Sequence, residues 1–185
     1  MNNRVLTVPN ALTFIRLLVL FPIIRALVQV RPWWFLLWVS IGILTDILDG
    51  IIARRFNQQS DIGRIADPII DKLNVLAASA YMTFSSDYIY PLWFFLFILL
   101  RELLIMAGSL TLIRNRHVVR ESNRPGKNSA FATGIAVLFS GLRLQPYAVI
   151  LIYIACALTV YSTYIYIRVY VQQVRKSGQN TDQTL

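Results

Sequence analysis

The apolar residues of this chain occur in long runs rather than at the spacing of an amphipathic surface helix. Each run is close to the roughly 20 residues that a helix needs to cross a bilayer. A helix that is apolar on all sides is expected in apolar surroundings. The pattern therefore predicts an all-α integral membrane protein with about six transmembrane helices, at approximately residues 11–30, 33–55, 62–85, 89–113, 128–142 and 146–171.

The links between these runs are short, and prolines stand where three of the runs would begin, at Pro32, Pro91 and Pro146. The fifth run is short and rich in small residues, which indicates close packing against a neighbouring helix. We expect one membrane-embedded domain over residues 1–176, followed by a polar, disordered tail over residues 177–185. No removable signal peptide is expected, because Trp33 and further apolar runs follow the first one.

Composition narrows the possible chemistry. The chain has 185 residues, of which 56% are hydrophobic and 15% charged, and its mean hydropathy is +0.56. So few charged residues cannot cover a water-soluble core of this size. Cys156 is the only cysteine and His117 the only histidine. A bound metal would therefore depend on oxygen ligands, which favours a hard divalent cation.

The basic residues that give the chain its net charge of +9 are unevenly distributed along the sequence. Basic residues stand beside or between the apolar runs, which favours contact with anionic lipid or phosphate-bearing substrates over nucleic acid. The positive-inside rule places both termini, and the link between the second and third runs, at the cytoplasmic face. An aromatic belt is expected at the opposite face, from Trp33, Trp34, Tyr88, Tyr90 and Trp93.

Four aspartates lie within the second and third apolar runs. A carboxylate at membrane depth costs several kcal/mol unless it is paired or functional. Asp46 and Asp49 share one helical stripe, and Asp67 and Asp71 share a stripe on the next helix. Two antiparallel helices can present these stripes to each other as a four-carboxylate box at the cytoplasmic face. Such a box suits one or two Mg²⁺ or Mn²⁺ ions, with water and substrate phosphates completing the coordination.

Glycine, alanine and arginine residues accompany the aspartates at fixed offsets. The segment from Asp46 to Asp71 reads D-x-x-D-G-x-x-A-R-x8-G-x-x-x-D-x-x-x-D. It resembles the signature of the CDP-alcohol phosphotransferases and agrees with it at every defined position. The resemblance implies a catalytic domain that transfers a phosphatidyl or similar group from a CDP-linked donor to an alcohol and releases CMP. It also implies a homodimer with one site per protomer and two divalent ions.

The same resemblance assigns roles to the aspartates. Asp46, Asp49 and Asp67 match the ligands of one metal ion. Asp67 and Asp71 match the ligands of the second ion, and Asp71 also matches the general base.

The cytidine and diphosphate of the donor would lie against the small and basic residues of the signature. Gly50, Ala53 and Arg54 match the part of the family motif that holds CDP, and Gly63 belongs to the same motif on the next helix. The carboxylates of Asp46, Asp49 and Asp67 would complete the CDP site.

Basic residues elsewhere in the chain are candidates for binding a phosphate of the acceptor. Arg16, within N-x-x-T-x-x-R, fits this role or that of an interfacial arginine reaching the lipid headgroups. Arg101 either binds the phosphate or belongs with Glu102 to a polar network between helices. The remaining candidates lie near a predicted helix N-terminus, or simply form a positive-inside loop, and they are Arg120, Arg124 and Lys127.

The acceptor is suggested by residues 67–72, which read D-P-x-x-D-K. This form is most similar to that of phosphatidylglycerophosphate synthases and CMP-forming cardiolipin synthases. Together with Arg101, Glu102 and the basic loop, it favours a phosphatidylglycerophosphate synthase, which joins CDP-diacylglycerol to sn-glycerol 3-phosphate. The departures are the lack of a further arginine after Glu102 and of a Gly-Lys-x-Lys-Thr run at Gly126. The alternative is a CMP-forming cardiolipin synthase, with phosphatidylglycerol as acceptor. A cation or proton transporter is the rival class, but it does not require Gly50, Ala53, Arg54 and Gly63 at fixed offsets.

Overall fold

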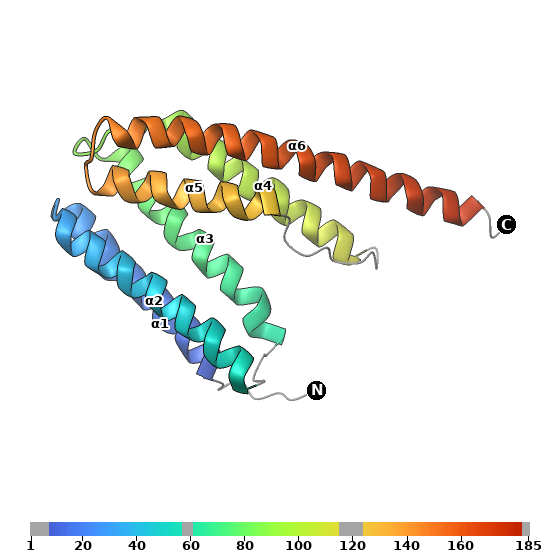
Figure 1. The fold of residues 1–185 in the computed structure, drawn as a ribbon, viewed down its shortest axis with the longest axis horizontal. Helices are drawn as coiled ribbons and strands as arrows, with labels where there is room; N and C mark the ends of the chain where they lie inside the picture. Colours follow the sequence, from blue (N-terminus) through green and yellow to red (C-terminus); the bar gives the residue numbers. More distant parts are fainter. Residues whose placement is uncertain (1–7, 57–60, 115–123, 183–185) are drawn as a thin grey trace.

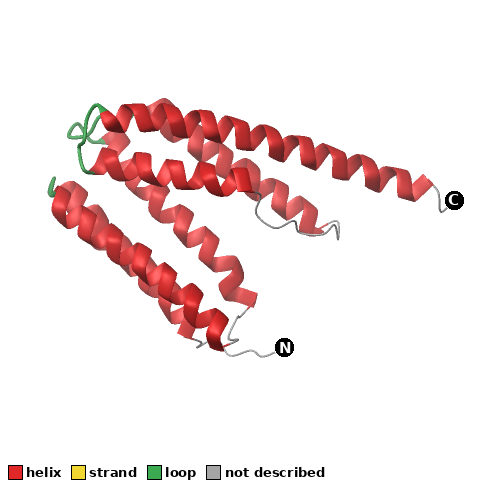
Figure 2. Ribbon diagram, viewed as in Figure 1, coloured by secondary structure: helices red, strands yellow, loops and turns green. Residues whose placement is uncertain are grey.

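The computed structural model describes residues 8–56, 61–114 and 124–182, and the side chains of residues 17–48, 51, 72–106 and 125–168. The described residues form six α-helices and no strand (Figures 1 and 2). The helices are α1 (Val8–Val28), α2 (Pro32–Phe56), α3 (Asp61–Phe84), α4 (Leu92–Arg114), α5 (Arg124–Gly141) and α6 (Tyr147–Asp182). The predicted all-α architecture is confirmed.

The helix boundaries follow the prolines. Pro32 is the first residue of α2, and Pro91 and Pro146 directly precede α4 and α6. The fifth helix starts at Arg124 instead of residue 128, because Pro125 is tolerated in a first turn, where its missing N–H has no helical partner. The sixth helix continues to Asp182, so the structure is helical over residues 177–182, where a disordered tail was expected. No proline interrupts this helix, and a helix can add one hydrogen bond for each further residue.

The chain runs up and down, so that successive helices are antiparallel (Figure 1). The turns at residues 29–31, 85–91 and 142–146 lie together at one end of the bundle, called here the turn end. The end of α2 and the beginning of α3 lie at the opposite end, called here the aspartate end. The topology therefore brings the two parts of the aspartate signature to one end of the molecule.

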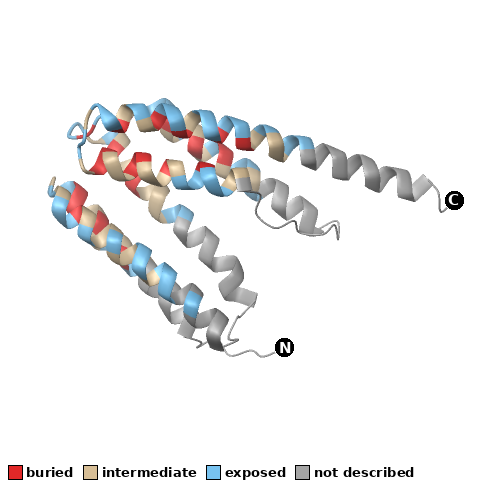
Figure 3. Ribbon diagram, in the orientation of Figure 1, coloured by how far each residue is buried: buried red, intermediate tan, exposed pale blue. Residues whose placement is uncertain are grey.

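Helix α3 joins two groups of helices, α1 with α2, and α4 with α5 and α6. Helix α1 packs against both α2 and α3, while α5 packs along α6. Helix α3 also contacts α4 and α5. Among the described side chains, the largest fully buried ones are Leu27, Phe35, Met82, Phe94 and Ile152, and Figure 3 marks the buried positions along the described part of the bundle.

At the turn end, one hydrogen bond caps the end of α1 and another ties it to the turn before α4. Val30 is in the left-handed conformation (φ 51°), and the Arg31 N–H donates to the Ala26 carbonyl at 2.9 Å. The Tyr88 hydroxyl donates to the Leu27 carbonyl at 2.8 Å. Burial raises the pKa of Tyr88, because desolvation disfavours the charged phenolate.

The prediction of an aromatic belt is partly wrong. Trp33, Trp34 and Trp93 are exposed, but Tyr88 and Tyr90 are buried. The Tyr90 hydroxyl donates to Ser79 Oγ at 3.2 Å. Both tyrosines turn inward because their hydroxyls find hydrogen-bond acceptors within the bundle, so they no longer need the polar interface.

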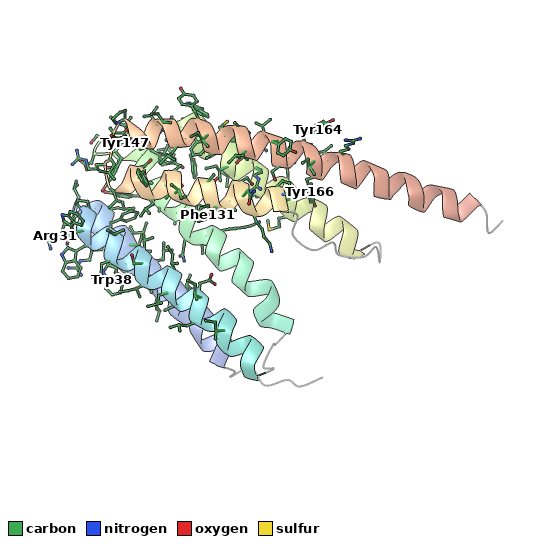
Figure 4. The ribbon with its side chains drawn as sticks, viewed as in Figure 1. Arg31, Trp38, Phe131, Tyr147, Tyr164 and Tyr166 are labelled. Atoms are coloured by element: carbon green, nitrogen blue, oxygen red, sulfur yellow. The ribbon has the colours of Figure 1, made fainter. Side chains whose placement is uncertain are left out.

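Many large apolar residues are exposed. Figure 3 marks the exposed positions along the ribbon in pale blue, and Figure 4 draws the described side chains, with Phe131 and Tyr147 among those labelled. Phe21 is 81% exposed and Trp33 79%, and Phe131 is also exposed. Apolar exposure of this extent indicates apolar surroundings or a partner surface. Within the described residues, the segment Tyr147–Arg168 is long and apolar enough to cross a membrane, whereas Leu17–Val28 and Pro32–Leu48 are apolar but shorter. The number of membrane crossings stays a prediction.

Candidate functional site

The signature aspartates occupy the last three turns of α2 and the first three turns of α3. Asp46 and Asp49 lie on α2, and Asp67 and Asp71 lie on α3. The backbone is helical through both segments, so each pair shares a helical stripe as predicted. Both segments lie at the aspartate end (Figure 1).

Of these four aspartates, only Asp46 has a described side chain, and it is exposed. The side chains of Asp49, Asp67 and Asp71 lie outside the described residues, as do those of Ala53 and Arg54 and the surroundings of Gly50 and Gly63. The described side chains include no group of three or more metal-ligating residues, but three of the four signature carboxylates are not among them. The donor set still fits a hard divalent cation, since all its members are carboxylates, on two consecutive helices whose signature-bearing parts lie at one end of the bundle.

A described cluster of polar side chains includes Lys72, the residue that follows Asp71 in the sequence. The Glu102 carboxylate accepts a hydrogen bond from Arg101 Nη1 at 2.5 Å and forms an ion pair with Lys72 Nζ at 2.5 Å. Arg101 Nη2 donates to Ser129 Oγ at 2.9 Å, and Ser129 Oγ donates to the Gly126 carbonyl at 3.0 Å. We call Lys72, Arg101, Glu102 and Ser129 the polar bridge, because they connect α3, α4 and α5.

The polar bridge is mostly buried and carries a surplus of positive charge. Arg101 is 8% exposed, Glu102 is nearly as buried, and Ser129 is inaccessible, whereas the Lys72 side chain is 44% exposed. Two cations share one carboxylate, and the buried Nε of Arg101 has no hydrogen-bond partner among the described residues. Of the two alternatives for Arg101, the structure shows the polar network between helices, and phosphate binding stays a prediction.

The sequence is also similar to known proteins over most of its length. A profile of the CDP-alcohol phosphatidyltransferase family matches residues 6–161, a range that contains the whole signature. The chain belongs to this family. The membership agrees with the resemblance that the signature predicted.

Relatives within the CDP-alcohol phosphatidyltransferase family carry two kinds of name. A CMP-forming cardiolipin synthase of Streptomyces coelicolor is 38% identical, with 70% of this chain and 62% of that protein covered. A putative cardiolipin synthase of Mycobacterium tuberculosis is 38% identical, with 62% and 54% covered. The CDP-diacylglycerol–glycerol-3-phosphate 3-phosphatidyltransferase of Aquifex aeolicus is 31% identical, with 74% and 76% covered. The chain thus spans between half and two thirds of the first two relatives.

The other basic candidates of this phosphatidyltransferase-family chain are only partly placed. Lys127 is exposed in the first turn of α5, two residues before Ser129, so Lys127 and the end of the Arg101 side chain lie at the same part of α5. Arg16 lies on α1 and Arg124 begins α5, but their side chains lie outside the described residues. Arg120 lies outside the described residues altogether.

Sequence reasoning missed two members of the polar bridge, Lys72 and Ser129. Lys72 was noted only as part of the D-P-x-x-D-K form, and Ser129 only as a small residue of the fifth run. A signal was present for Lys72, since it is a cation beside an aspartate within an apolar run. No spacing within one helix could have paired it with Glu102, because that contact depends on how α3 and α4 pack.

Proposed function

We propose that this family member transfers a phosphatidyl group from CDP-diacylglycerol to sn-glycerol 3-phosphate, giving phosphatidylglycerophosphate and CMP. One observation carries the proposal. The complete signature from Asp46 to Asp71 lies within the family-matched region, on two helices whose signature-bearing parts lie at one end of the bundle. The relative from Aquifex aeolicus, which bears the name of this activity, matches 74% of the chain.

The signature residues would hold the donor. Asp46, Asp49, Asp67 and Asp71 would bind one or two Mg²⁺ or Mn²⁺ ions, which supply neutralising charge to the donor diphosphate when bound. Arg54 would contact the same diphosphate from the last turn of α2. Gly50, Ala53 and Gly63 carry little or no side chain, so cytidine and diphosphate can approach the helix backbone there.

Asp71 would be the general base. It takes the proton of the acceptor hydroxyl as that oxygen forms a bond to the phosphorus that carries diacylglycerol. The bond between this phosphorus and the CMP oxygen breaks, and CMP departs with its charge stabilised by Arg54.

The charge of the polar bridge supports a small phosphate-bearing acceptor. Two cations against one carboxylate leave positive charge beside the first turns of α5, where Lys127 is exposed. The N-terminus of a helix adds backbone N–H groups and a favourable dipole for an anion. Arg16, Arg120 and Arg124 are further candidates for this acceptor site.

The second candidate function is CMP-forming cardiolipin synthesis, with phosphatidylglycerol as acceptor. The observation that favours it is the 38% identity to relatives named as cardiolipin synthases. The two functions share the donor, the released CMP and the signature, and they differ only in the acceptor.

The proposed setting is a multi-pass membrane protein with both termini and the aspartate end in the cytoplasm. The exposed apolar side chains support the membrane setting, and the basic residues near the aspartate end support the orientation. We propose a homodimer with one site per protomer, as the family resemblance implies.

The test follows CMP release by purified protein in detergent with CDP-diacylglycerol and Mg²⁺, and each acceptor is supplied alone. Release with glycerol 3-phosphate supports the proposal, whereas release only with phosphatidylglycerol moves the assignment to cardiolipin synthesis. If no CMP is released with any alcohol, both proposed functions are overturned.

The variant Asp71→Asn tests the general base. It is expected to lower CMP release by a factor on the order of 10²–10⁴ and to retain donor binding, since a base contributes about this much to the rate. The matched control is Asp87→Asn, because Asp87 is an exposed aspartate at the turn end and its loss is expected to leave the rate unchanged. Full activity of Asp71→Asn would show that another group takes the proton.

A further inference from the structure

One carboxylate joins the helix of the proposed general base to the rest of the bundle. Glu102, on α4, binds Lys72 of α3 through one oxygen and Arg101 through the other. Lys72 directly follows Asp71, so the ion pair restrains the helical turn that carries the proposed base. The inference drawn from this contact rests on the proposed function.

The restraint continues to a buried side chain of α5. Arg101 reaches Ser129 on α5, and the Ser129 hydroxyl is itself bonded to the Gly126 carbonyl. Successive residues of a helix do not normally face each other. The contact between Arg101 and Glu102 therefore requires both side chains to turn to one side, and the bond to Ser129 holds the guanidinium there. A chain of polar contacts thus runs from the buried Ser129 of α5 to Lys72, which follows Asp71 on α3.

We propose that Glu102 is a positioning residue for the transfer reaction. By holding Lys72, Glu102 fixes how the helical turn of Asp71 is rotated about the α3 axis and how far along that axis it lies. Both are set relative to α4 and α5, the helices that carry Arg101 and Lys127. The base must lie within hydrogen-bond reach of the acceptor hydroxyl, so a small displacement of this turn lowers the rate of the chemical step. Glu102 itself contacts neither the donor nor the acceptor in this role.

Half-exposed lysines usually extend toward water, which makes the Lys72 contact informative. Nearly half of the Lys72 side chain is accessible, yet its ammonium lies against a carboxylate that is only 13% exposed. The pairing therefore brings the lysine inward, toward the Arg101 side of α4. Either end of the ion pair can be removed separately, and the two removals have different structural consequences.

The experiment compares three variants in the CMP-release assay with CDP-diacylglycerol and the acceptor that supports the wild type. Glu102→Gln removes the charge but leaves Arg101 buried beside a neutral amide, so this variant is at risk of misfolding. Lys72→Met removes only the α3 partner of the ion pair and leaves the contacts of Arg101 with Glu102 and Ser129 in place, so this variant is expected to fold. Lys72→Arg retains a cation opposite Glu102.

The expected result is a fall in kcat of about 10–100-fold for Lys72→Met, with the KM for both substrates changed by less than about threefold. Lys72→Arg is expected to recover most of this loss. The matched control is Tyr90→Phe, which removes another polar contact to α3, the bond to Ser79 at the turn end. It is expected to lower thermal stability and leave kcat unchanged.

Each other result has a defined meaning. Wild-type protein that releases no CMP with any acceptor refutes the proposed function and leaves no reaction for Glu102 to position. If the wild type is active, a folded Lys72→Met with normal kcat overturns the positioning role. A Lys72→Met that changes only the KM for the acceptor overturns it as well, because Lys72 would then bind that substrate directly.

Discussion

Gly141, at the end of α5, lies against the Phe35 ring of α2, and this contact yields a sharp prediction. A Cβ atom added at Gly141 would lie 2.4 Å from Phe35 Cε1 and 2.5 Å from Cζ. Carbon atoms pack favourably at about 3.5–4.0 Å, so the methyl group of Gly141→Ala requires a shift of about 1 Å. The Phe35 ring cannot swing into open space, because it is 1% exposed.

The cost follows from two opposing effects. Forcing an additional carbon into a packed core costs about 1–3 kcal/mol. Alanine gains at most about 1 kcal/mol over glycine in a helix interior, and less at Gly141, which is the last residue of α5. We therefore expect Gly141→Ala to lower the free energy of unfolding by about 1–2 kcal/mol.

The same helix provides the matched control. A Cβ at Gly134 meets nothing within 4 Å, so Gly134→Ala is expected to be neutral or to stabilise by up to about 1 kcal/mol. The assay is equilibrium unfolding in mixed micelles with increasing denaturing detergent, followed by tryptophan fluorescence. In the double variant Gly141→Ala/Phe35→Leu, much of the destabilisation caused by the alanine should be lost. The two substitutions should therefore show a coupling free energy of about 0.5–3 kcal/mol in a double-mutant cycle. A Gly141→Ala protein as stable as the wild type would refute the α2–α5 contact.

Two further predictions concern the turn end and the signature. Val30→Gly is expected to raise the free energy of unfolding by up to about 1 kcal/mol, because Val30 has a positive φ that a β-branched residue adopts at a cost. A lower unfolding midpoint of this variant would contradict the prediction. Asp49→Ala, or removal of divalent ions with a chelator, is expected to abolish CDP binding measured by calorimetry, with recovery on Mg²⁺ addition only in the wild type. CDP binding retained by the chelated wild type would contradict a metal-dependent site.

The helices were predictable from the sequence because apolar runs and prolines are local signals. The start of α5 was not, since residues 124–127 read Arg-Pro-Gly-Lys and look like a loop, whereas a first turn accepts both proline and charge. The small residues of the fifth run indicated close packing, and of its two glycines it is Gly141, not Gly134, that lies against a neighbouring side chain. Which glycine faces a neighbour depends on how α5 is rotated against α2, and composition does not contain that information.

The residues of the candidate site could be predicted from the sequence, but the contacts that hold the surrounding helices together could not. The aspartate spacing predicted two helical stripes, and the structure places both at one end of the bundle. The alternatives for Arg101 could not be separated from the sequence, because its partner Ser129 is 28 residues away on another helix. Tyr88 and Tyr90 were assigned to the interface by residue type, but their hydroxyls bond to Leu27 and Ser79 inside the bundle.

The relative position of the two signature helices depends on a third element, α1. Helix α1 packs against α2, which carries Asp46 and Asp49, and against α3, which carries Asp67 and Asp71. Helix α3 is further held by α4 and α5, partly through the polar bridge, whereas α2 has its main described contact with α1. The spacing between the two aspartate pairs therefore depends on α1 on one side and on the polar bridge on the other. A packing change between α1 and α2 should alter metal-dependent CDP binding, whereas loss of the polar bridge should alter the rate of transfer after CDP has bound.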